Sequence, residues 1–227
     1  MKLKSTNNKI PKVLIFDYDD TLVQTRKIRY ETLKRMSSKV FGYTLETSEI
    51  DAVWGLPADE FLLNLFSDKN DNLYELWDIY LQFCAEDPNI PYDYVLQFIQ
   101  KNSEKYRFGI LTASSFKTVS NEIQKINLDK ELFFKIQTAE ETIVHKPNPA
   151  VFEPICKKLF QEGVTKSEIL YIGDSPSDHK ASTGFGISFL GMAHDNRNID
   201  YFSSLQVPFV KNFYELENYF ENEFLND

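Results

Sequence analysis

Residues 13 to 22 read VLIFDYDDTL, an apolar run followed at once by three aspartates among four residues. The run from Val13 to Phe16 shows no polar alternation, which is typical of a strand buried on both faces of a parallel sheet. Because side chains alternate along a strand, we expect Asp17 and Asp19 to point to the same side and Asp20 elsewhere. Two carboxylates at such close range favour a bound cation.

The size and charge of the chain narrow the class of protein. Its 227 residues suffice for one α/β domain with an insertion or for two modest domains. The formal net charge of −9 disfavours a general nucleic-acid binder. No apolar run approaches the length of a membrane span, and the basic segment 1–12 lacks the apolar stretch of a signal peptide. We therefore expect a cytoplasmic protein, a monomer or weak homodimer, that acts on a small molecule and binds neither nucleic acid nor a membrane.

The cysteines and histidines give no sign of a redox or metal site. Cys84 and Cys156 lack metal-ligand spacing, so two buried or unreactive thiols are expected rather than a disulfide framework. The three histidines are scattered along the chain, and we expect them to be structural or exposed to solvent.

From residue 92 onward, strand and helix patterns alternate. Pro154 lies inside one predicted helix, where it removes an intrahelical hydrogen bond and predicts a kink. The alternation predicts an α/β fold, a Rossmann-like parallel sheet with helices on both faces. Strands are predicted at residues 106–111, 133–137, 169–172 and 187–190 and from 208, and helices at 92–101, 116–126 and 149–160, from 176, and after the last strand.

An insertion separates the first strand from this alternating part. Helical patterns cover residues 26–41, 58–66 and 73–83 without a convincing strand. A crossover between parallel strands needs little more than a dozen residues, yet about ninety separate the first two core strands. We predict a helical cap domain at residues 24–88 and a core domain formed by 1–23 with 89–227. Loops at the carboxyl ends of strands border the binding crevice of such sheets, so the cap is expected over the site.

Three further segments end core strands in polar residues: ILTAS at 110–114, HKPNP at 145–149 and IGDSPSD at 172–178. Each also has an ordinary structural explanation. Thr112 and Ser114 fit caps of the following helix, and Lys146 fits a solvated loop residue. Likewise, the serine and proline after Asp174 fit a helix start.

The joint pattern is harder to explain by structure alone, because each group follows a successive core strand and parallel strands bring these ends together. Hard carboxylate oxygens suit Mg²⁺, which typically takes one or two carboxylates and a substrate phosphate. A lysine beside a metal offsets the repulsion between a phosphate and an anionic nucleophile. The expected pocket, suited to phosphoryl transfer, holds Asp17, Asp19, Thr112, Lys146, Asp174 and Asp178.

At these residues the sequence resembles the haloacid dehalogenase superfamily, whose four motifs match DYDDT, the threonine of ILTAS, the lysine of HKPNP, and GDSPSD, in this order. The helical insertion resembles the family's first type of cap, as in its phosphoglycolate phosphatase and β-phosphoglucomutase branch. The resemblance implies that Asp17 attacks phosphorus to form an aspartyl-phosphate. It also implies that Asp19 protonates the leaving group and then activates water.

The same resemblance implies the remaining roles. Thr112 and the amide of Ala113 would bind phosphoryl oxygens, and Lys146 would steady the nucleophile and the phosphate. Asp20 stands where the family often has glycine, so we expect it to hold the turn without taking part in the chemistry. The implied Mg²⁺ ligands are the Asp17 carboxylate, the Asp19 backbone carbonyl and the Asp174 carboxylate, with Asp178 supporting nearby.

In the insertion, WGLPADEFLLNLF at 54–66 resembles the Gly-x-Pro loop and following helix found in caps of this branch, which makes Gly55 a candidate substrate contact. An ordinary turn before an amphipathic helix explains it equally well. Arg26, Tyr30 and Arg35 lie on the first predicted cap helix. They could contact an anionic or polar substrate, or they could equally form the solvated face of that helix.

The leading hypothesis is a Mg²⁺-dependent phosphatase acting on a small phosphorylated metabolite. A phosphosugar mutase of the β-phosphoglucomutase type and a catalytically idle binding protein of the same fold remain alternatives. Asp19 and Asp174 argue against a dehalogenase, which needs neither an acid for a departing alkoxide nor a metal site.

Overall fold

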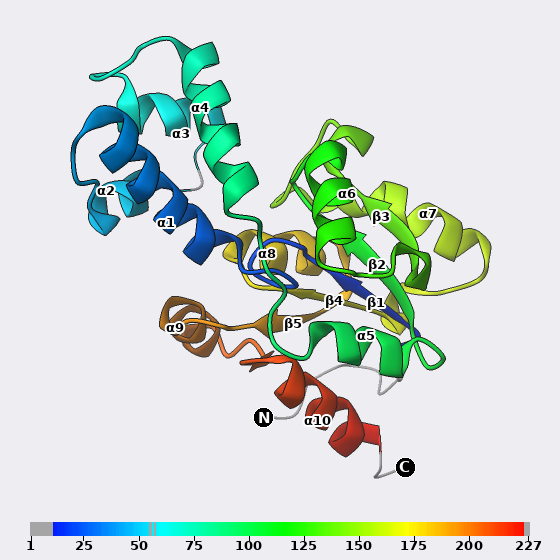
Figure 1. The fold of residues 1–227 in the computed structure, drawn as a ribbon. Helices are drawn as coiled ribbons and strands as arrows, with labels where there is room; N and C mark the ends of the chain where they lie inside the picture. Colours follow the sequence, from blue (N-terminus) through cyan, green and yellow to red (C-terminus); the bar gives the residue numbers. More distant parts are fainter. Residues whose placement is uncertain (1–10, 55, 57, 225–227) are drawn as a thin grey trace. The chain divides into compact units, whose positions relative to one another are not determined.

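The computed structural model describes residues 11–54, 56 and 58–224. The chain divides into two compact units, one formed by Met1–Gln24 with Ile90–Asp227 and the other by Thr25–Asn89. We call them the core unit and the helical unit (Figure 1).

The core unit is built on a parallel sheet, as the alternating pattern predicted. Its order is β3-β2-β1-β4-β5-β6, so the strand that precedes the aspartates lies inside the sheet, paired on both sides. The Rossmann-like α/β fold class is therefore confirmed. The strands are β1 (Val13–Phe16), β2 (Arg107–Leu111), β3 (Phe133–Gln137), β4 (Ile169–Gly173), β5 (Ser188–Met192) and β6 (Phe209–Val210).

Both faces of this sheet are buried, which explains the uninterrupted apolar run of β1. Leu14 and Phe16 belong to one hydrophobic cluster, and Val13 and Ile15 belong to another. The first cluster includes residues of α5 (Val95–Asn102), α6 (Phe116–Lys125) and α10 (Phe213–Phe224). The second includes residues of α7 (Glu153–Gln161), α8 (Pro176–Phe185) and α9 (Asn196–Ser204). Short helical turns lie at Lys130–Leu132, Ala139–Glu141, Pro149–Phe152 and Lys166–Glu168.

The predicted helix at 149–160 is divided in two, and the kink expected at Pro154 was wrong. A 3-10 turn over Pro149–Phe152 precedes α7, which begins at Glu153. Pro154 therefore lies in the first turn of α7, where a missing backbone N–H removes no intrahelical hydrogen bond.

The helical unit contains α1 (Thr25–Met36), a π-helical segment (Ser37–Phe41), α2 (Thr47–Val53), α3 (Ala58–Phe66) and α4 (Leu73–Glu86). These helices enclose a hydrophobic cluster of their own. Neither α2 nor α9 was predicted. They span seven and nine residues, and the apolar pairs at helical spacing, Ile50 with Val53 and Ile199 with Phe202, are too short a pattern for a helix prediction. Among the described helices, none is long and apolar enough to cross a membrane.

Candidate active site

The polar residues predicted to meet at the sheet edge follow β1, β2 and β4. The N–H of Asp17 donates to the Ile172 carbonyl at 2.9 Å, which extends the pairing of β1 with β4 by one residue. The N–H of Thr112 donates to Gln137 at 3.0 Å and extends the pairing of β2 with β3 in the same way. The backbone ladder therefore positions these two side chains.

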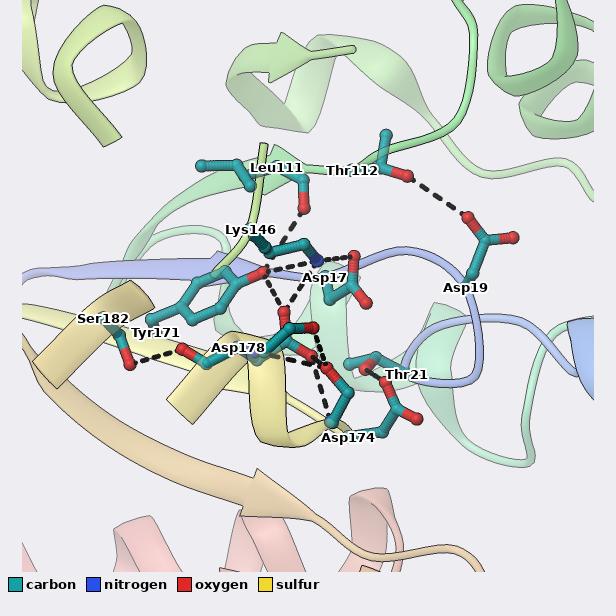
Figure 2. Close-up of polar contacts among 12 residues, drawn as sticks. Asp17, Asp19, Thr21, Leu111, Thr112, Lys146, Tyr171, Asp174, Asp178 and Ser182 are labelled. Atoms are coloured by element: carbon teal, nitrogen blue, oxygen red, sulfur yellow. Dashed lines mark hydrogen bonds and ion pairs between the residues drawn. The ribbon is translucent and has the colours of Figure 1, made fainter. Parts of the chain in front are cut away.

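Lys146 joins the carboxylates that follow β1 and β4. Its Nζ lies 2.8 Å from Oδ1 of Asp17 and 2.7 Å from Oδ1 of Asp178 (Figure 2). All three side chains are at least nine-tenths buried, with exposed fractions of 8%, 8% and 0%. The explanation of Lys146 as a solvated loop residue is therefore wrong, because its ammonium lies among buried carboxylates.

Asp178 is held by the start of α8 and by a close approach of the backbone. Its Oδ2 accepts from the N–H of Ser175 at 3.0 Å and from the Ser175 hydroxyl at 2.6 Å, in a capping box. A Cβ added at Gly173 would lie only 2.6 Å from Cγ of Asp178. The glycine of GDSPSD is thus required by the space that this carboxylate occupies.

Tyr171 completes the group, although it belongs to none of the four motifs. Its hydroxyl donates to Oδ1 of Asp178 at 2.9 Å and accepts from Nζ of Lys146 at 3.2 Å. Burial, followed by the charges of Asp178 and Asp17, raises the pKa of Tyr171 well above its ordinary value, so the hydroxyl keeps its proton. A hydroxyl in the middle of a doubly buried strand needs a partner, and that requirement was the available signal.

The electrostatics of the group reflect three carboxylates beside one lysine. Burial is the largest influence on Asp17 and raises its pKa; the charges of Asp178 and Asp19 also raise it, and Lys146 acts in the opposite direction. Burial and the charges of Asp178 and Asp17 raise the pKa of Asp174 as well. Burial alone would lower the pKa of Lys146, but the two carboxylates outweigh burial and raise it. The lysine therefore stays charged, and the group holds an excess of acid.

Asp19 has a different environment from that of Asp17. Its Oδ2 accepts from the Ser114 hydroxyl at 2.7 Å and from the Thr112 hydroxyl at 3.2 Å, and Figure 2 shows it turned toward Thr112. Asp20, directly after it, has a φ of +53°, a left-handed conformation that glycine adopts freely and aspartate tolerates. This conformation explains the glycine that often stands at that position in the resembling family.

The carboxylates form a group that could hold a metal ion. One ligand oxygen from each of Asp17, Asp174 and Asp178 lies within 4.8 Å of the others. Because the set consists of carboxylate oxygens, it fits a hard cation such as Mg²⁺ better than a metal that prefers sulfur or nitrogen. The group also holds more buried negative charge than positive charge, and a bound cation would balance it.

Two further expectations concern the segment after β2. Ala113 follows Thr112 and is exposed. The helix cap expected from Thr112 or Ser114 is instead Ser115, whose hydroxyl accepts from the N–H of Thr118 at 3.2 Å. The hydroxyls of Thr112 and Ser114 are thus directed to Asp19 instead of to the helix end.

The candidate residues of the insertion have partners inside the helical unit. Arg26 donates to Asp51 at 2.6 Å, and the hydroxyl of Tyr30 donates to the same carboxylate oxygen at 2.8 Å. Arg35 forms ion pairs with Glu86 and Asp87. Gly55 lies outside the residues that the structure describes.

Comparisons with known proteins identify the family. A profile of the family described as haloacid dehalogenase-like hydrolase matches residues 14–192. A relative from Clostridium perfringens that carries the name "Putative pyrophosphatase PpaX" is 23% identical over 188 residues, which cover 81% of this chain and 84% of that protein.

Solved structures share the fold. The "putative HAD-hydrolase YfnB" from Bacillus subtilis, bound to magnesium, superposes with a TM-score of 0.75 and 20% identity over 94% of this chain and 100% of its own. A structure from Thermotoga maritima titled as a "putative beta-phosphoglucomutase" gives a TM-score of 0.72 and 18% identity over 88% and 94% of the two chains. At these identities the structures establish the fold alone. The family profile spans most of the chain, including the residues that meet at the sheet edge, and the protein belongs to the haloacid dehalogenase-like hydrolases.

Proposed function

We propose that this hydrolase is a Mg²⁺-dependent phosphatase that hydrolyses the phosphate monoester of a small metabolite through an aspartyl-phosphate on Asp17. One observation carries the proposal: Asp17 is buried, is paired with Lys146 at 2.8 Å, and shares a group with two further carboxylates. A buried carboxylate fixed beside a cation is a suitable nucleophile, because the cation also attracts the phosphate that it must attack.

The excess of acid supports the metal requirement. The nucleophile must be ionised, yet burial and the neighbouring carboxylates raise the pKa of Asp17. Bound Mg²⁺ would supply the missing positive charge, favour the ionised carboxylate and neutralise the transferring phosphoryl group. We assign direct ligation to Asp17, to Asp174 and to the backbone carbonyl of Asp19.

Asp178 fits a supporting role better than direct ligation. Both of its oxygens already accept two hydrogen bonds or ion-pair contacts, Oδ1 from Lys146 and Tyr171 and Oδ2 from Ser175. It therefore orients the lysine and the tyrosine that surround the nucleophile.

The proposed reaction runs in two steps. Asp17 attacks phosphorus while the bond from phosphorus to the leaving oxygen breaks, and Asp19 gives that oxygen its proton. Water then attacks the phosphorus, gives a proton to Asp19, and releases phosphate and the free Asp17 carboxylate. Thr112 and the amide of Ala113 bind phosphoryl oxygens throughout.

The test is phosphate release from a panel of sugar phosphates, phosphoglycolate, nucleoside monophosphates, polyol phosphates and, because of the relative's name, inorganic pyrophosphate. Activity should vanish on chelation, return with Mg²⁺ and return poorly with Ca²⁺, whose coordination shell is larger and looser.

Asp17→Asn should keep the thermal midpoint and lose activity by about 1,000-fold or more. Asp20→Asn, on the same loop, is the matched control. Turnover by a metal-free sample, or by Asp17→Asn without deamidation, would contradict the proposal; phosphate transfer between sugar positions would favour a mutase.

We further propose that the helical unit, as a cap, selects the substrate while the core unit performs the chemistry. The proposal rests on the position of Arg26 in the chain: it lies at the start of α1, two residues after the first segment of the core unit, which ends at Gln24. Arg26→Ala and Tyr30→Phe should change the ratio of kcat/KM for the best metabolite to that for an aryl phosphate. The control, Arg35→Met, should not change this ratio. An equal fall in both constants would rule out a selective role for Arg26 and Tyr30.

A further inference from the structure

We infer that Ser114 is a positioning residue that orients Asp19 for proton transfer in both steps of the reaction. The inference rests on the proposed phosphatase function and concerns a residue outside the four motifs. It is carried by a 2.7 Å hydrogen bond from the Ser114 hydroxyl to Oδ2 of Asp19, the shorter of the two hydroxyl contacts on that oxygen.

The loop after β2 holds this serine in place through its backbone. The N–H of Ser114 donates to the Thr112 hydroxyl at 3.0 Å, and its carbonyl accepts from the N–H of Ala139 at 3.0 Å. The side chain is partly buried, and the next residue, Ser115, is the N-cap of α6. Because the backbone of Ser114 is held by hydrogen bonds on both sides, its hydroxyl can set the direction of the carboxylate to which it donates.

Thr112 cannot take over this task when substrate is bound. Its hydroxyl carries one hydrogen, which is directed at Asp19 in this structure and would be needed by a phosphoryl oxygen in the complex. Once Thr112 turns to the phosphate, the Ser114 hydroxyl continues to hold Oδ2 of Asp19. Ser114 is therefore not redundant with the threonine of the motif.

A neutral donor suits the chemistry that Asp19 must perform. In the first step the P–O bond to the leaving group breaks, and the leaving oxygen takes the proton from the carboxyl group of Asp19. In the second step water attacks phosphorus, its proton passes to the Asp19 carboxylate, and the P–O bond to Asp17 breaks. Oδ2 can accept from a hydroxyl in both protonation states, so Ser114 preserves one orientation through both steps. A lysine would favour only the ionised state, as Lys146 does for Asp17.

A comparison of two leaving groups can distinguish whether Ser114 positions the acid Asp19 or has only a general structural role. An alkoxide needs a proton as it departs, whereas a nitrophenolate leaves without one. The experiment measures kcat/KM, which reports the steps up to cleavage of the ester, for the best alkyl phosphate of the panel and for 4-nitrophenyl phosphate. The proteins are Mg²⁺-loaded wild type, Ser114→Ala, Ser114→Thr and the adjacent control Ser115→Ala.

Ser114→Ala should lose about tenfold or more in kcat/KM for the alkyl ester and change less than about twofold for the nitrophenyl ester. Ser114→Thr, which keeps a hydroxyl, should recover most of the loss, and Ser115→Ala should leave the ratio of the two constants unchanged. In an Asp19→Asn background, the change at Ser114 should have no further effect on the alkyl ester, because the proton donor is already absent.

Equal losses for both esters, or no loss for either, in a folded Ser114→Ala protein would overturn the inference while leaving the proposed phosphatase function intact. A further loss in the Asp19→Asn background would also overturn it. Turnover that persists in Asp17→Asn would reject the proposed mechanism itself, and the role of Ser114 with it.

Discussion

Two charged clusters in different units of this protein share a plan and differ in their surroundings. In the core unit, Lys146 lies between Asp17 and Asp178 with exposed fractions of 8%, 8% and 0%. In the helical unit, Arg35 lies between Glu86 and Asp87, whose side chains are 64% and 32% exposed. We call these the Lys146 cluster and the Arg35 cluster. Each has one long cation between two carboxylates, but only the Lys146 cluster is buried.

The clusters also differ in charge balance. The Lys146 cluster adjoins a third carboxylate, Asp174, and burial with that crowding raises the pKa of both Asp17 and Asp174. Arg35 has its pKa raised mainly by hydrogen bonds to Glu86 and Asp87, and it also lies over the ring of Phe83 at 4.7 Å. A solvated pair joins α1 to the end of α4 at little cost, whereas unbalanced buried charge opposes folding. The chemistry proposed at the end of β1 explains why this protein keeps unbalanced buried charge there.

The largest effect is expected from removing the cation of the buried cluster. Lys146→Met should lower the free energy of unfolding by about 3 kcal/mol in the absence of metal, because carboxylates are left buried without a counterion. Activity should fall by about 100-fold or more. Mg²⁺ should restore part of the stability, since it supplies positive charge to the same carboxylates.

Denaturant unfolding with and without Mg²⁺ measures this, with Lys158→Met as the control because Lys158 is 71% exposed on α7. If metal-free Lys146→Met proved as stable as the exposed control, the contrast between buried and solvated clusters would be wrong.

Tyr171→Phe sharpens the comparison by removing one hydroxyl. The change leaves Asp178 and Lys146 each without one partner, so we expect a loss of about 1–2 kcal/mol in unfolding free energy. We expect roughly a tenfold fall in kcat as Lys146 loses its fixed position. Tyr106→Phe, at another buried tyrosine of the core unit, controls for the loss of a hydroxyl in general. A larger loss of activity in Tyr106→Phe would contradict this assignment.

Part of the fold and part of the candidate site could be predicted from the sequence. β1, β3 and α3 have the predicted bounds, because each is an apolar run or an amphipathic repeat that ends in turn-forming or polar residues. Asp17, Thr112 and Asp174 each directly follow a strand, so the parallel order of the strands predicts that they meet at one edge. Lys146 does not follow a strand directly, because β3 ends at Gln137 and a 3-10 turn comes between them. The contacts of the Tyr171 and Ser114 hydroxyls could not be predicted, because they depend on side-chain directions that strand order does not determine: Tyr171 donates to Asp178 of α8, seven positions away, and Ser114 donates to Asp19, 95 positions away.

Asp174→Asn should act in the opposite direction and stabilise the metal-free protein. The pKa of Asp174 is raised on folding, so between about pH 4 and that higher value the native state binds more protons than the unfolded state. Stability of the wild type therefore falls as pH rises through this window, and an amide avoids the loss. We expect a gain of about 1 kcal/mol at pH 8 and less at pH 5, together with weaker Mg²⁺ binding. Thermal unfolding at the two pH values measures it; a gain independent of pH would have another cause.

The smallest effect is expected in the Arg35 cluster. Arg35→Met keeps a long apolar side chain near Phe83 and removes the ion pairs with Glu86 and Asp87, so the loss should be about 1 kcal/mol or less. Because solvated pairs are screened, the difference from wild type should shrink further between 0.05 and about 0.5 M salt. The loss in Lys146→Met should change much less over that range, since its carboxylates are buried. Parallel denaturant titrations of the two variants at both salt concentrations make the comparison. An equal dependence on salt would show that burial does not separate the clusters, and that the buried excess of acid needs another explanation.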